Sequence, residues 1–475
     1  MQLYDTLSNA KKFLKPRSGN KIEIFVCGPT VYDYSHIGHA RTYIAFDAFV
    51  KYLRLKGYEV RYLQNITDID DKIIARAKET NRNVKQLAES FADAYYEDMK
   101  ALGIDSVDIY ARATDYIPEI ISQVERLLDN GYAYQIPHDG VYYDISTFGD
   151  YGKLSRRTIE QAEDAVSRID ESTKKRNKGD FALWKLSNKG APTRKPQSEP
   201  KWPSPWGDGR PGWHIEDTAI TEKYFGSQYD IHGGARDLVF PHHEAEIAQI
   251  EAISGKKPLV HYWLHSGFLT IGGVKMSKSL GNFITIRDLL HNHSKEAFRL
   301  FVFSSHYRSP INYTENAVRQ AEANARRLGE FMQRVEGCLP STPRTTKGDS
   351  PNTFTVKKFV SQFERELEDD FNTPNALAVV FDLIREGNTL LDQQRVGPED
   401  CVDILEFLNR LNRIFGIIPE MMSLQIPAKV RELVEQREQL RIAKKWKESD
   451  NVRAEVEKMG YRIEDLPSGP QIKKA

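Results

Sequence analysis

The segment from Cys27 to Ala40 combines residue types that suit the binding of a nucleotide triphosphate. It holds His36, Gly38 and His39 where a strand gives way to a helix. A helix start offers unpaired backbone N–H groups and a positive dipole end to phosphate, and a glycine lets a flat base approach the backbone. The alternative is that the two histidines only cap and pack the helix.

A second segment, residues 272–282, is a loop bracketed by glycines. Its chemistry-bearing residues are Lys275, Met276, Ser277, Lys278 and Ser279. Flexible ammonium groups on such a loop can close over phosphates and stabilise the charge that develops on a departing pyrophosphate. The alternative is a solvated basic loop with no ligand.

The elements around the first segment predict a parallel sheet. Residues 22–27 read as a strand, a helical pattern runs from about 36 to 56, and residues 58–64 read as a second strand, followed by helices at 70–78 and 84–102. A strand, a crossover helix and a strand in so short a span are typical of parallel pairing. Ligands of such sheets bind at the carboxyl ends of the strands, which is where the first segment lies.

The rest of the chain reads differently. Residues 110–205 predict one helix at 116–129, a short strand at 140–145 and then a polar stretch, with a proline-rich loop at 186–201. Strand and helix alternate again at 229–286, so we expect the sheet to resume after an insertion. From 314 the pattern is helical almost throughout, apart from a polar linker at 340–352, and for the basic tail at 429–475 an exposed helix of mixed charge is the simplest interpretation.

Composition excludes some classes of protein. The 475 residues hold 67 Lys or Arg and 67 Asp or Glu, so the formal net charge is zero, which excludes a uniformly basic nucleic-acid coat but not a local basic groove. No apolar run is long enough for a membrane span, and the first residues lack the order of a signal peptide. The three cysteines are odd in number and far apart, which argues against a disulfide framework. We therefore expect a cytoplasmic protein.

The two nucleotide segments also match a known family. His36-Ile37-Gly38-His39 and Lys275-Met276-Ser277-Lys278-Ser279 match the HIGH and KMSKS signatures of class I aminoacyl-tRNA synthetases. Within that class the chain most resembles the cysteinyl-tRNA synthetases over most of its length. The likeness includes residues 25–33, 65–73, 209–216, 230–234 and 240–244, and residues 369–374 resemble the helical-bundle signature of the same family.

The resemblance implies a fold and a set of domains. The expected fold is α/β, a Rossmann-like parallel-sheet catalytic domain with an inserted connective subdomain, followed by a helical tRNA-binding bundle and a small C-terminal module. The expected boundaries are 1–110 and 206–270 for the halves of the catalytic domain, 111–205 for the insertion, 271–313 for the KMSKS loop and stem-contact region, 314–425 for the anticodon-stem-binding bundle, and 426–475 for the anticodon-binding module.

The same resemblance implies a zinc ion that binds the thiolate of the substrate cysteine. Carried over position by position, the ligands are Cys27, Asp217, His242 and Glu246, and position 217 is usually cysteine in the family. The spacing of His242 and Glu246 places both on one helical face. Aspartate keeps the charge of a thiolate and is accepted by zinc, but it makes a harder site that should bind zinc less tightly. The alternative is that zinc is lost and these are ordinary residues.

The remaining site residues also come from the resemblance. Amino-acid contacts are expected from Gly28, Thr67, Trp213 and Asp237, although Trp213 as a core residue and Asp237 as a turn residue are the plainer interpretations. ATP with Mg²⁺ is expected to bind His36, Gly38, His39 and residues 275–279, with His36, His39, Lys275 and Lys278 catalytic. For tRNA we expect the basic and aromatic C-terminal region to matter, with Arg437, Arg441, Lys445, Trp446 and Arg453 as candidates.

The predicted function is the activation of L-cysteine with Mg-ATP to cysteinyl adenylate, followed by transfer to tRNA(Cys), in a monomer that binds no membrane. Positioning and electrostatics supply the catalysis. Three alternatives stay open. The first is a ligase that joins cysteine to an amino sugar. The helical region after 314 counts against it, because such ligases lack a full anticodon-binding end. A decayed tRNA-binding paralogue, suggested by Asp217, is opposed by the intact nucleotide motifs, and a synthetase for another amino acid is opposed by the retained Cys27, Trp213, His242 and Glu246.

Overall fold

The computed structural model describes residues 1–158, 174–187, 199–277, 280–339, 356–420, 427–466 and 469–474. The chain forms two compact units. The first comprises Met1–Glu322, Gln362–Leu377 and Arg413–Ile417, and the second comprises Ala323–Ser361, Ala378–Asn412 and Ile418–Ala475. Among the described residues, none of the helices has both the length and the apolar character needed to cross a bilayer.

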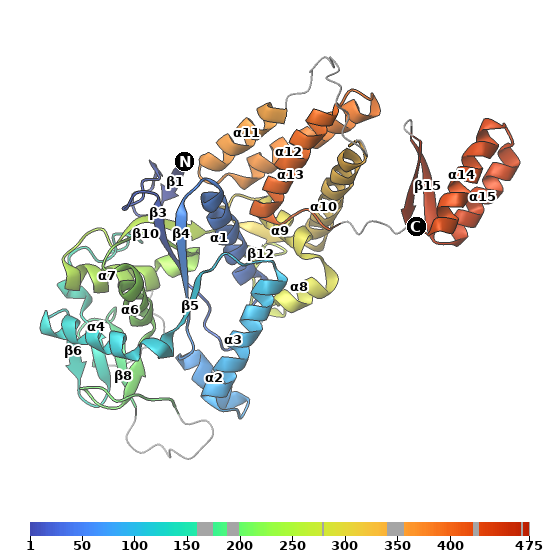
Figure 1. The fold of residues 1–475 in the computed structure, drawn as a ribbon. Helices are drawn as coiled ribbons and strands as arrows, with labels where there is room; N and C mark the ends of the chain where they lie inside the picture. Colours follow the sequence, from blue (N-terminus) through green and yellow to red (C-terminus); the bar gives the residue numbers. More distant parts are fainter. Residues whose placement is uncertain are drawn as a thin grey trace. The chain divides into compact units, whose positions relative to one another are not determined.

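The first unit is built on a five-stranded parallel sheet with the order β11-β10-β3-β4-β5 (Figure 1). Its strands are β3 (Lys21–Val26), β4 (Glu59–Ile66), β5 (Ile109–Arg112), β10 (Tyr229–Ala235) and β11 (Val260–Ser266). In the register of the central strands, Ile24 lies opposite Tyr62 on one side and Ile231 on the other. The central strands are mostly buried because helices cover both faces.

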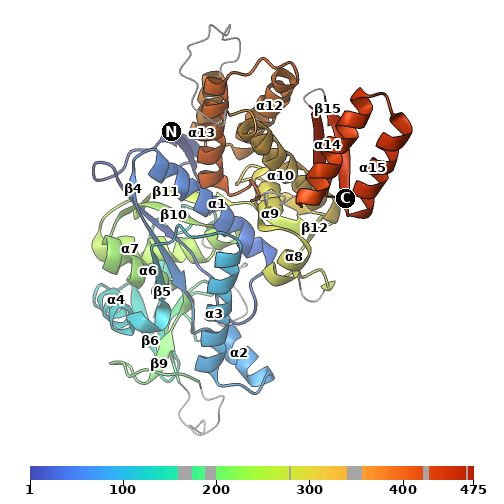
Figure 2. The same cartoon turned by 45° about the vertical axis from the view of Figure 1, so that its right-hand side comes forward.

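The strand order runs outward in both directions from the centre of this sheet, and the crossover helices change face there. Helix α1 (Ile37–Leu55) leads from β3 to β4, and α7 (His242–Ser254) leads from β10 to β11 on the opposite face (Figures 1 and 2). Right-handed crossovers that run outward in both directions from β3 and β10 force this arrangement. The two strands thus form the switch point, the place where open parallel sheets bind ligands.

Further helices complete the first half of the sheet. Helices α2 (Asp71–Glu79) and α3 (Val84–Ala101) link β4 to β5, and α6 (Trp213–Phe225) precedes β10. At the start of the chain, β1 (Gln2–Asp5) pairs with β2 (Ala10–Phe13) as an antiparallel hairpin. The predictions of strands at 22–27 and 58–64 and of the three following helices are confirmed within two or three residues.

The insertion between β5 and α6 is a four-stranded antiparallel sheet with the order β6-β7-β8-β9. Its elements are η1 (Ala113–Tyr116), α4 (Ile117–Asp129), β6 (Ala133–Ile136), β7 (Gly140–Tyr143), η2 (Ile145–Thr147), β8 (Phe181–Leu186) and β9 (Gly209–Pro211). The sequence pattern predicted only the helix and β7. It missed the other strands, which have three to six residues and are defined by pairing with distant segments, as when β7 pairs with β8. Most of the predicted loop at 186–201 lies outside the described residues.

Beyond the parallel sheet the chain becomes mainly helical. The strands β12 (Leu269–Ile271), β13 (Val274–Lys275) and β14 (Ile311–Tyr313) form a small sheet. Helices α8 (Ile286–Asn292) and α9 (Lys295–Phe303) lie between β13 and β14 in the sequence. Then follow α10 (Glu315–Glu336), α11 (Val356–Glu368), α12 (Thr373–Asp392) and α13 (Pro398–Phe415). The predicted linker at 340–352 lies outside the described residues.

The C-terminal part of the second unit has its own small core. Helices α14 (Ala428–Ile442) and α15 (Trp446–Lys458) pack with the hairpin of β15 (Tyr461–Leu466) and β16 (Gly469–Lys474) around Val430, Leu433, Val434, Val452, Val456 and Ile463. The helical prediction is therefore confirmed for 314–458 wherever the structure describes the chain, apart from its loops. It is wrong for 461–466 and 469–474, which form a two-stranded sheet.

A buried ion pair fastens α9 to α1 within the first unit. The guanidinium Nη2 of Arg299 lies 2.8 Å from Oδ2 of Asp47, and both side chains are 1% exposed or less. Nη1 of Arg299 also donates to the carbonyl of Leu102 at 3.1 Å, and its Nε donates to the carbonyl of Phe415. One side chain thus joins four segments that are far apart in sequence.

Replacing Arg299 with methionine is expected to lower the free energy of unfolding by about 3–5 kcal/mol, because among the described residues it leaves the buried Asp47 carboxylate with Lys51 as its remaining cationic partner. Urea denaturation measures the change. Arg54→Met is the matched control, since the Arg54–Asp108 pair is about one-third exposed and should contribute only about 0–1 kcal/mol. Equal losses in the two variants would contradict the structural role of Arg299.

Candidate active site

The switch point of the sheet carries a fully buried polar cluster. Cys27 follows β3 directly, and its amide donates to the carbonyl of Gly233 in β10 at 3.1 Å. Helix α6 contributes Asp217, and the first turns of α7 contribute His242 and Glu246. These four side chains are 5% exposed or less. Residues from three separate elements are thus placed around one point by the topology of the sheet.

The four side chains predicted as zinc ligands come together in the structure. Their ligand atoms all lie within 4.8 Å of one another. Cys27 Sγ is 3.4 Å from Asp217 Oδ2, and His242 Nε2 is 2.9 Å from the same oxygen and 3.2 Å from Glu246 Oε1. The geometry gives a thiol, an imidazole and two carboxyl groups, and their role as ligands stays a prediction.

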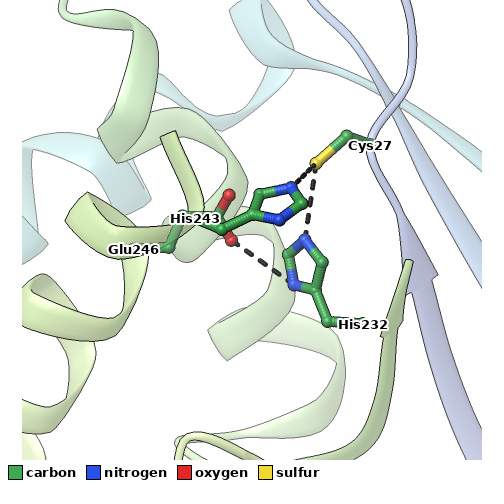
Figure 3. A group of neighbouring side chains, drawn as sticks. All are labelled: Cys27, His232, His243 and Glu246. Carbon is green, nitrogen blue, oxygen red and sulfur yellow. Dashed lines mark hydrogen bonds and ion pairs between the residues drawn. The ribbon is translucent and has the colours of Figure 1, made fainter. Parts of the chain in front are cut away.

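Two further histidines face the same thiol and were not among the predicted ligands. His232 lies in β10 and His243 follows His242 in α7. Figure 3 shows both imidazoles directed at Cys27, with Nε2 of His232 3.4 Å and Nε2 of His243 3.1 Å from Sγ. Both lie in segments that resemble the family, residues 230–234 and 240–244, so the sequence did mark them as candidates. Their positions in the sequence do not show which histidine faces the thiol.

Burial governs the protonation of this cluster. It raises the pKa of the Cys27 thiol well above its usual range, and the nearby Asp217 and Glu246 add to the shift. Burial also raises the pKa of the Glu246 carboxyl, with Asp217 as the second cause. It lowers the pKa of His232 and His243 well below the usual value. Without a cation, the pocket therefore favours uncharged forms of these four groups.

The carboxyl oxygens of the cluster are short of hydrogen-bond donors. Within the part of the chain that the structure describes, no donor bonds to Oδ1 of Asp217 or to either oxygen of Glu246. An unpaired buried carboxyl oxygen costs free energy, and a divalent cation would satisfy several of them at once. Sulfur, imidazole nitrogen and carboxylate oxygen are also the donors that zinc accepts. The residues present therefore fit a metal ion.

The HIGH segment begins helix α1 with a reciprocal cap. His36 is the N-cap residue, and its Nδ1 accepts hydrogen bonds from the amides of Gly38 at 3.1 Å and His39 at 3.3 Å. Nδ1 of His39 accepts in turn from the amide of His36 at 3.4 Å, and the two rings stack with centroids 3.8 Å apart. The capping role considered from the sequence is therefore real, and it fixes the direction in which each ring points.

The KMSKS segment lies against the HIGH segment. The methyl carbon of Met276 is 3.5 Å from the position that a Cβ on Gly38 would occupy. The chain after the loop is tied to the same turn, since the amide of Ile37 donates to the carbonyl of Ile284 and that of Ile286 donates to the carbonyl of Ser35. Lys275 is exposed at the end of β13. Lys278 and Ser279 lie outside the described residues.

The four predicted amino-acid contacts have different surroundings. Trp213 begins α6, is half-buried, stacks on His242 with ring centroids 4.4 Å apart, and lines a pocket that also includes Thr30 and Lys72. Thr67 is buried and donates from Oγ1 to Glu216. Asp237 is exposed in η3 (Arg236–Val239). Of the four, only Trp213 lines this pocket.

Gly28 has a structural reason to be glycine. A Cβ at this position would lie 1.7 Å from the backbone carbonyl oxygen of Asn65, so no side chain fits there. The amide of Gly28 also donates to Oδ1 of Asn65 at 2.6 Å. The close approach brings the ends of β3 and β4 together beside Cys27.

The candidate tRNA residues on α14 and α15 are not equally available. Arg437 is 2% exposed, and its two terminal nitrogens lie 2.8 Å from the two oxygens of Asp465. Its burial and its bidentate pairing with Asp465 leave Arg437 less available to a phosphate than an exposed cation, and its contact with tRNA stays a prediction. Arg441 also contacts Asp465, at 2.9 Å, and Arg453 donates to the carbonyl of Ile463.

Two of the candidates in this module stay at the surface. Trp446 is 57% exposed, and the side chain of Lys445 is equally exposed, with Glu448 at 3.4 Å. Because both are exposed, Lys445 and Trp446 are more accessible to a nucleic acid than the buried Arg437 is.

Comparison with known proteins agrees with the fold and with the motifs. Residues 13–323 match the family of tRNA synthetases class I (C) catalytic domains, and residues 362–419 match the DALR domain. The cysteine–tRNA ligase of Thermococcus gammatolerans is 43% identical, covering 99% of this chain and 98% of that protein. That of Caldicellulosiruptor saccharolyticus is 40% identical over the whole of both chains.

Solved structures support the same architecture. Methionyl-tRNA synthetase of Mycobacterium tuberculosis, in complex with methionyl-adenylate, superimposes with a TM-score of 0.60 over 83% of this chain and 92% of that chain. The two sequences are only 15% identical, so this likeness concerns the fold. With the paired HIGH and KMSKS segments and the full-length matches, the chain belongs to the cysteine–tRNA ligase family of class I aminoacyl-tRNA synthetases.

Proposed function

We propose that this synthetase activates L-cysteine with Mg-ATP to cysteinyl adenylate and transfers the cysteinyl group to tRNA(Cys). The observation that carries the proposal is the buried cluster of Cys27, Asp217, His242 and Glu246 at the switch point of the sheet. The full-length likeness to cysteine–tRNA ligases and the DALR match do not favour the amino-sugar ligase or the decayed paralogue. We further propose that it acts as a cytoplasmic monomer.

The HIGH histidines are suited to donate hydrogen bonds to phosphate. Because Nδ1 of each ring accepts a backbone hydrogen bond, the neutral imidazoles of His36 and His39 carry their proton on Nε2. Burial lowers the pKa of His39 well below its usual value, which keeps that ring neutral. The two Nε2–H groups can therefore both face an anion. Gly38 keeps this turn open, because a Cβ there would lie 2.9 Å from the His36 ring and 3.5 Å from the methyl carbon of Met276.

The lysines of the KMSKS segment complete the nucleotide site in this proposal. Lys275 and Lys278 close on the phosphates, and Met276, Ser277 and Ser279 shape the loop. Their positive charges stabilise the pyrophosphate as it leaves, and no side chain needs to act as a covalent nucleophile. The exposure of Lys275 on a loop that touches the HIGH turn supports this role.

The buried cluster selects the amino acid. A zinc ion there would supply a Lewis acid that favours the ionised form of a thiol far more than that of a hydroxyl, which would separate cysteine from serine. The family resemblance gives Cys27, Asp217, His242 and Glu246 as the donors that would hold it, and Trp213 walls the pocket through its stacking on His242. Gly28, Thr67 and Asp237 act as the remaining amino-acid contacts, Gly28 and Thr67 through the close packing of β3 and β4.

For tRNA we propose that the DALR region and the C-terminal module make the contacts, within the domain boundaries given above. Lys445 and Trp446 are the candidates that their exposure supports, and Arg441 and Arg453 follow, because each is about one-third exposed but partly engaged. A basic group can follow phosphates, and an exposed indole can stack on an unpaired base.

The proposal is tested by ATP–pyrophosphate exchange with each standard amino acid, on enzyme of measured zinc content, before and after a chelator. We expect exchange with cysteine only, loss of exchange on chelation, and its return with zinc. Charging of tRNA(Cys) transcripts then measures the second step.

Two results would go against the proposal. Exchange with cysteine that survives complete removal of metal would remove the metal from selection but keep the synthetase. No exchange with any amino acid, despite tRNA binding, would instead indicate a decayed paralogue.

A further inference from the structure

Two overlapping sets of metal donors meet at Cys27. The carboxylate set is Cys27, Asp217, His242 and Glu246, and the histidine set is Cys27, His232, His243 and Glu246. We propose that the divalent cation of this chain is held by the histidine set. The inference deepens the metal part of the proposed function and rests on it only in requiring a cation in this pocket.

The distances in the histidine set suit a common ion. Two ligands of a tetrahedral zinc site, one sulfur and one nitrogen, lie about 3.6 Å apart at ordinary bond lengths. Nε2 of His232 and Nε2 of His243 lie 3.4 and 3.1 Å from Cys27 Sγ. Glu246 lies on the next turn of α7, with Oε2 3.4 Å from Nδ1 of His232 (Figure 3). Each of the four residues offers a ligand atom within 4.8 Å of the others, so a shift of the Glu246 carboxylate towards Cys27 would bring the donors onto one ion.

Outer contacts hold both imidazoles in the direction that an ion requires. Nδ1 of His232 is 2.6 Å from the hydroxyl of Tyr229, and Nδ1 of His243 is 2.8 Å from Nε2 of His265. The chain continues from Nδ1 of His265 to the hydroxyl of Thr6 at 2.7 Å. Metal-binding histidines commonly have such a partner on the ring nitrogen that does not face the ion. In both rings Nε2 is therefore the nitrogen turned towards the thiol.

The orientation of the rings does not decide which set binds the cation. His242 of the carboxylate set also has a partner on its other ring nitrogen, since its Nδ1 lies 2.8 Å from Nδ1 of His214. The hydrogen bond between His242 Nε2 and Asp217 Oδ2, at 2.9 Å, does separate the two sets. A cation in the carboxylate set must break this bond, since Nε2 of His242 would have to turn its lone pair to the ion. A cation in the histidine set leaves it intact.

The donor types favour the same choice. The carboxylate set offers one sulfur, one nitrogen and two oxygens. The histidine set offers one sulfur, two nitrogens and one oxygen. Imidazole nitrogen is a borderline donor that suits zinc better than a hard carboxylate oxygen does, so the histidine set should bind zinc more tightly.

An indole packs against both imidazoles of the histidine set. The indole of Trp263 stacks on His232 with ring centroids 4.4 Å apart and lies 5.3 Å from His243. Such packing lowers the local dielectric and strengthens the attraction between the ion and its anionic ligands. Substitution of thiolate by Asp217 is then compensated by imidazoles that the fold already directs at Cys27.

The test compares three variants of the full-length protein in zinc affinity, measured by competition with a chromogenic chelator, and in zinc content after dialysis. His243→Gln is expected to lower zinc affinity by at least about 100-fold, since loss of even an outer partner costs 10–100-fold. Asp217→Asn should change it by less than about 10-fold. The matched control is His214→Gln, which removes a buried imidazole of the same cluster that belongs to neither set and should bind zinc like the parent protein.

A spectroscopic measurement keeps the test decisive where a variant does not fold. X-ray absorption at the zinc edge of the parent protein counts imidazole ligands, and we expect two. A count of one, or a larger loss of affinity in Asp217→Asn than in His243→Gln, would overturn the histidine set while leaving the proposed zinc-dependent selection standing. Zinc absent from the parent protein at saturating concentration would overturn both, and cysteine-dependent exchange without metal would then show that the synthetase itself persists.

Discussion

Cys27→Ser is expected to reduce bound zinc from one ion per chain to a small fraction and to abolish cysteine-dependent ATP–pyrophosphate exchange. Cys27 is the one soft donor in either set of ligands, and a serine hydroxyl is a poor replacement for a thiolate. We expect zinc affinity to fall by more than about 100-fold, beyond the 10–100-fold cost of losing an outer partner. Metal analysis after dialysis and the exchange assay at saturating ATP measure the two effects.

Cys401→Ser is the matched control for this change. Cys401 is also fully buried, but it lies on α13, far along the chain and outside both donor sets. Its replacement should leave zinc content and exchange unchanged. Retention of stoichiometric zinc by Cys27→Ser would show that the metal, where present, is bound elsewhere.

Lys275→Ala is expected to lower the rate of exchange at saturating substrates by roughly 100- to 1,000-fold, the usual cost of removing one preorganised charge from a transition state. Zinc content and the free energy of unfolding should not change, because the side chain is exposed at the end of β13 and packs in no core. The effect should fall on kcat more than on KM for cysteine, since the ammonium acts on the phosphates. Steady-state exchange at varied ATP and cysteine separates these terms.

Lys256→Ala supplies the control, since it removes an equally exposed lysine from the loop after α7. It should change exchange by less than twofold. If Lys275→Ala raised only the KM for ATP and kept kcat, the loop would contribute to ground-state binding, and its role in the release of pyrophosphate would be wrong.

Much of the fold was predictable because its strongest local signals agree with its topology. The strand before Cys27, the helix closed by Gly57 and the next strand form one crossover unit, and the structure has them as β3, α1 and β4. The inserted sheet was not predictable in the same way. Its strands are held by pairing with each other across long stretches of chain, as when Val141 pairs with Trp184, and a local pattern does not carry that information.

The candidate site was also predictable only in part from the sequence. The family resemblance named Cys27, Asp217, His242 and Glu246 as one set, and the topology of the sheet explains why segments so far apart in sequence meet. The resemblance did not place His232 and His243 in that set, because which ring faces the thiol depends on the register of β10 against β3 and on the phase of α7. Nor did composition show that Arg437 is engaged by Asp465, a residue 28 positions later in the hairpin.

The hydrogen bonds that tie residues 35–37 to residues 284–286 also set the range of the KMSKS loop. The loop is held at its start too, where the amide of Gly273 donates to Oδ1 of Asn312 at 2.6 Å. About ten residues separate the two anchors, so the tip of even a fully stretched loop stays within about 17 Å of them. The length of the loop therefore limits how far from the HIGH turn its lysines can reach a phosphate. An insertion in this loop would extend that reach without changing any lysine.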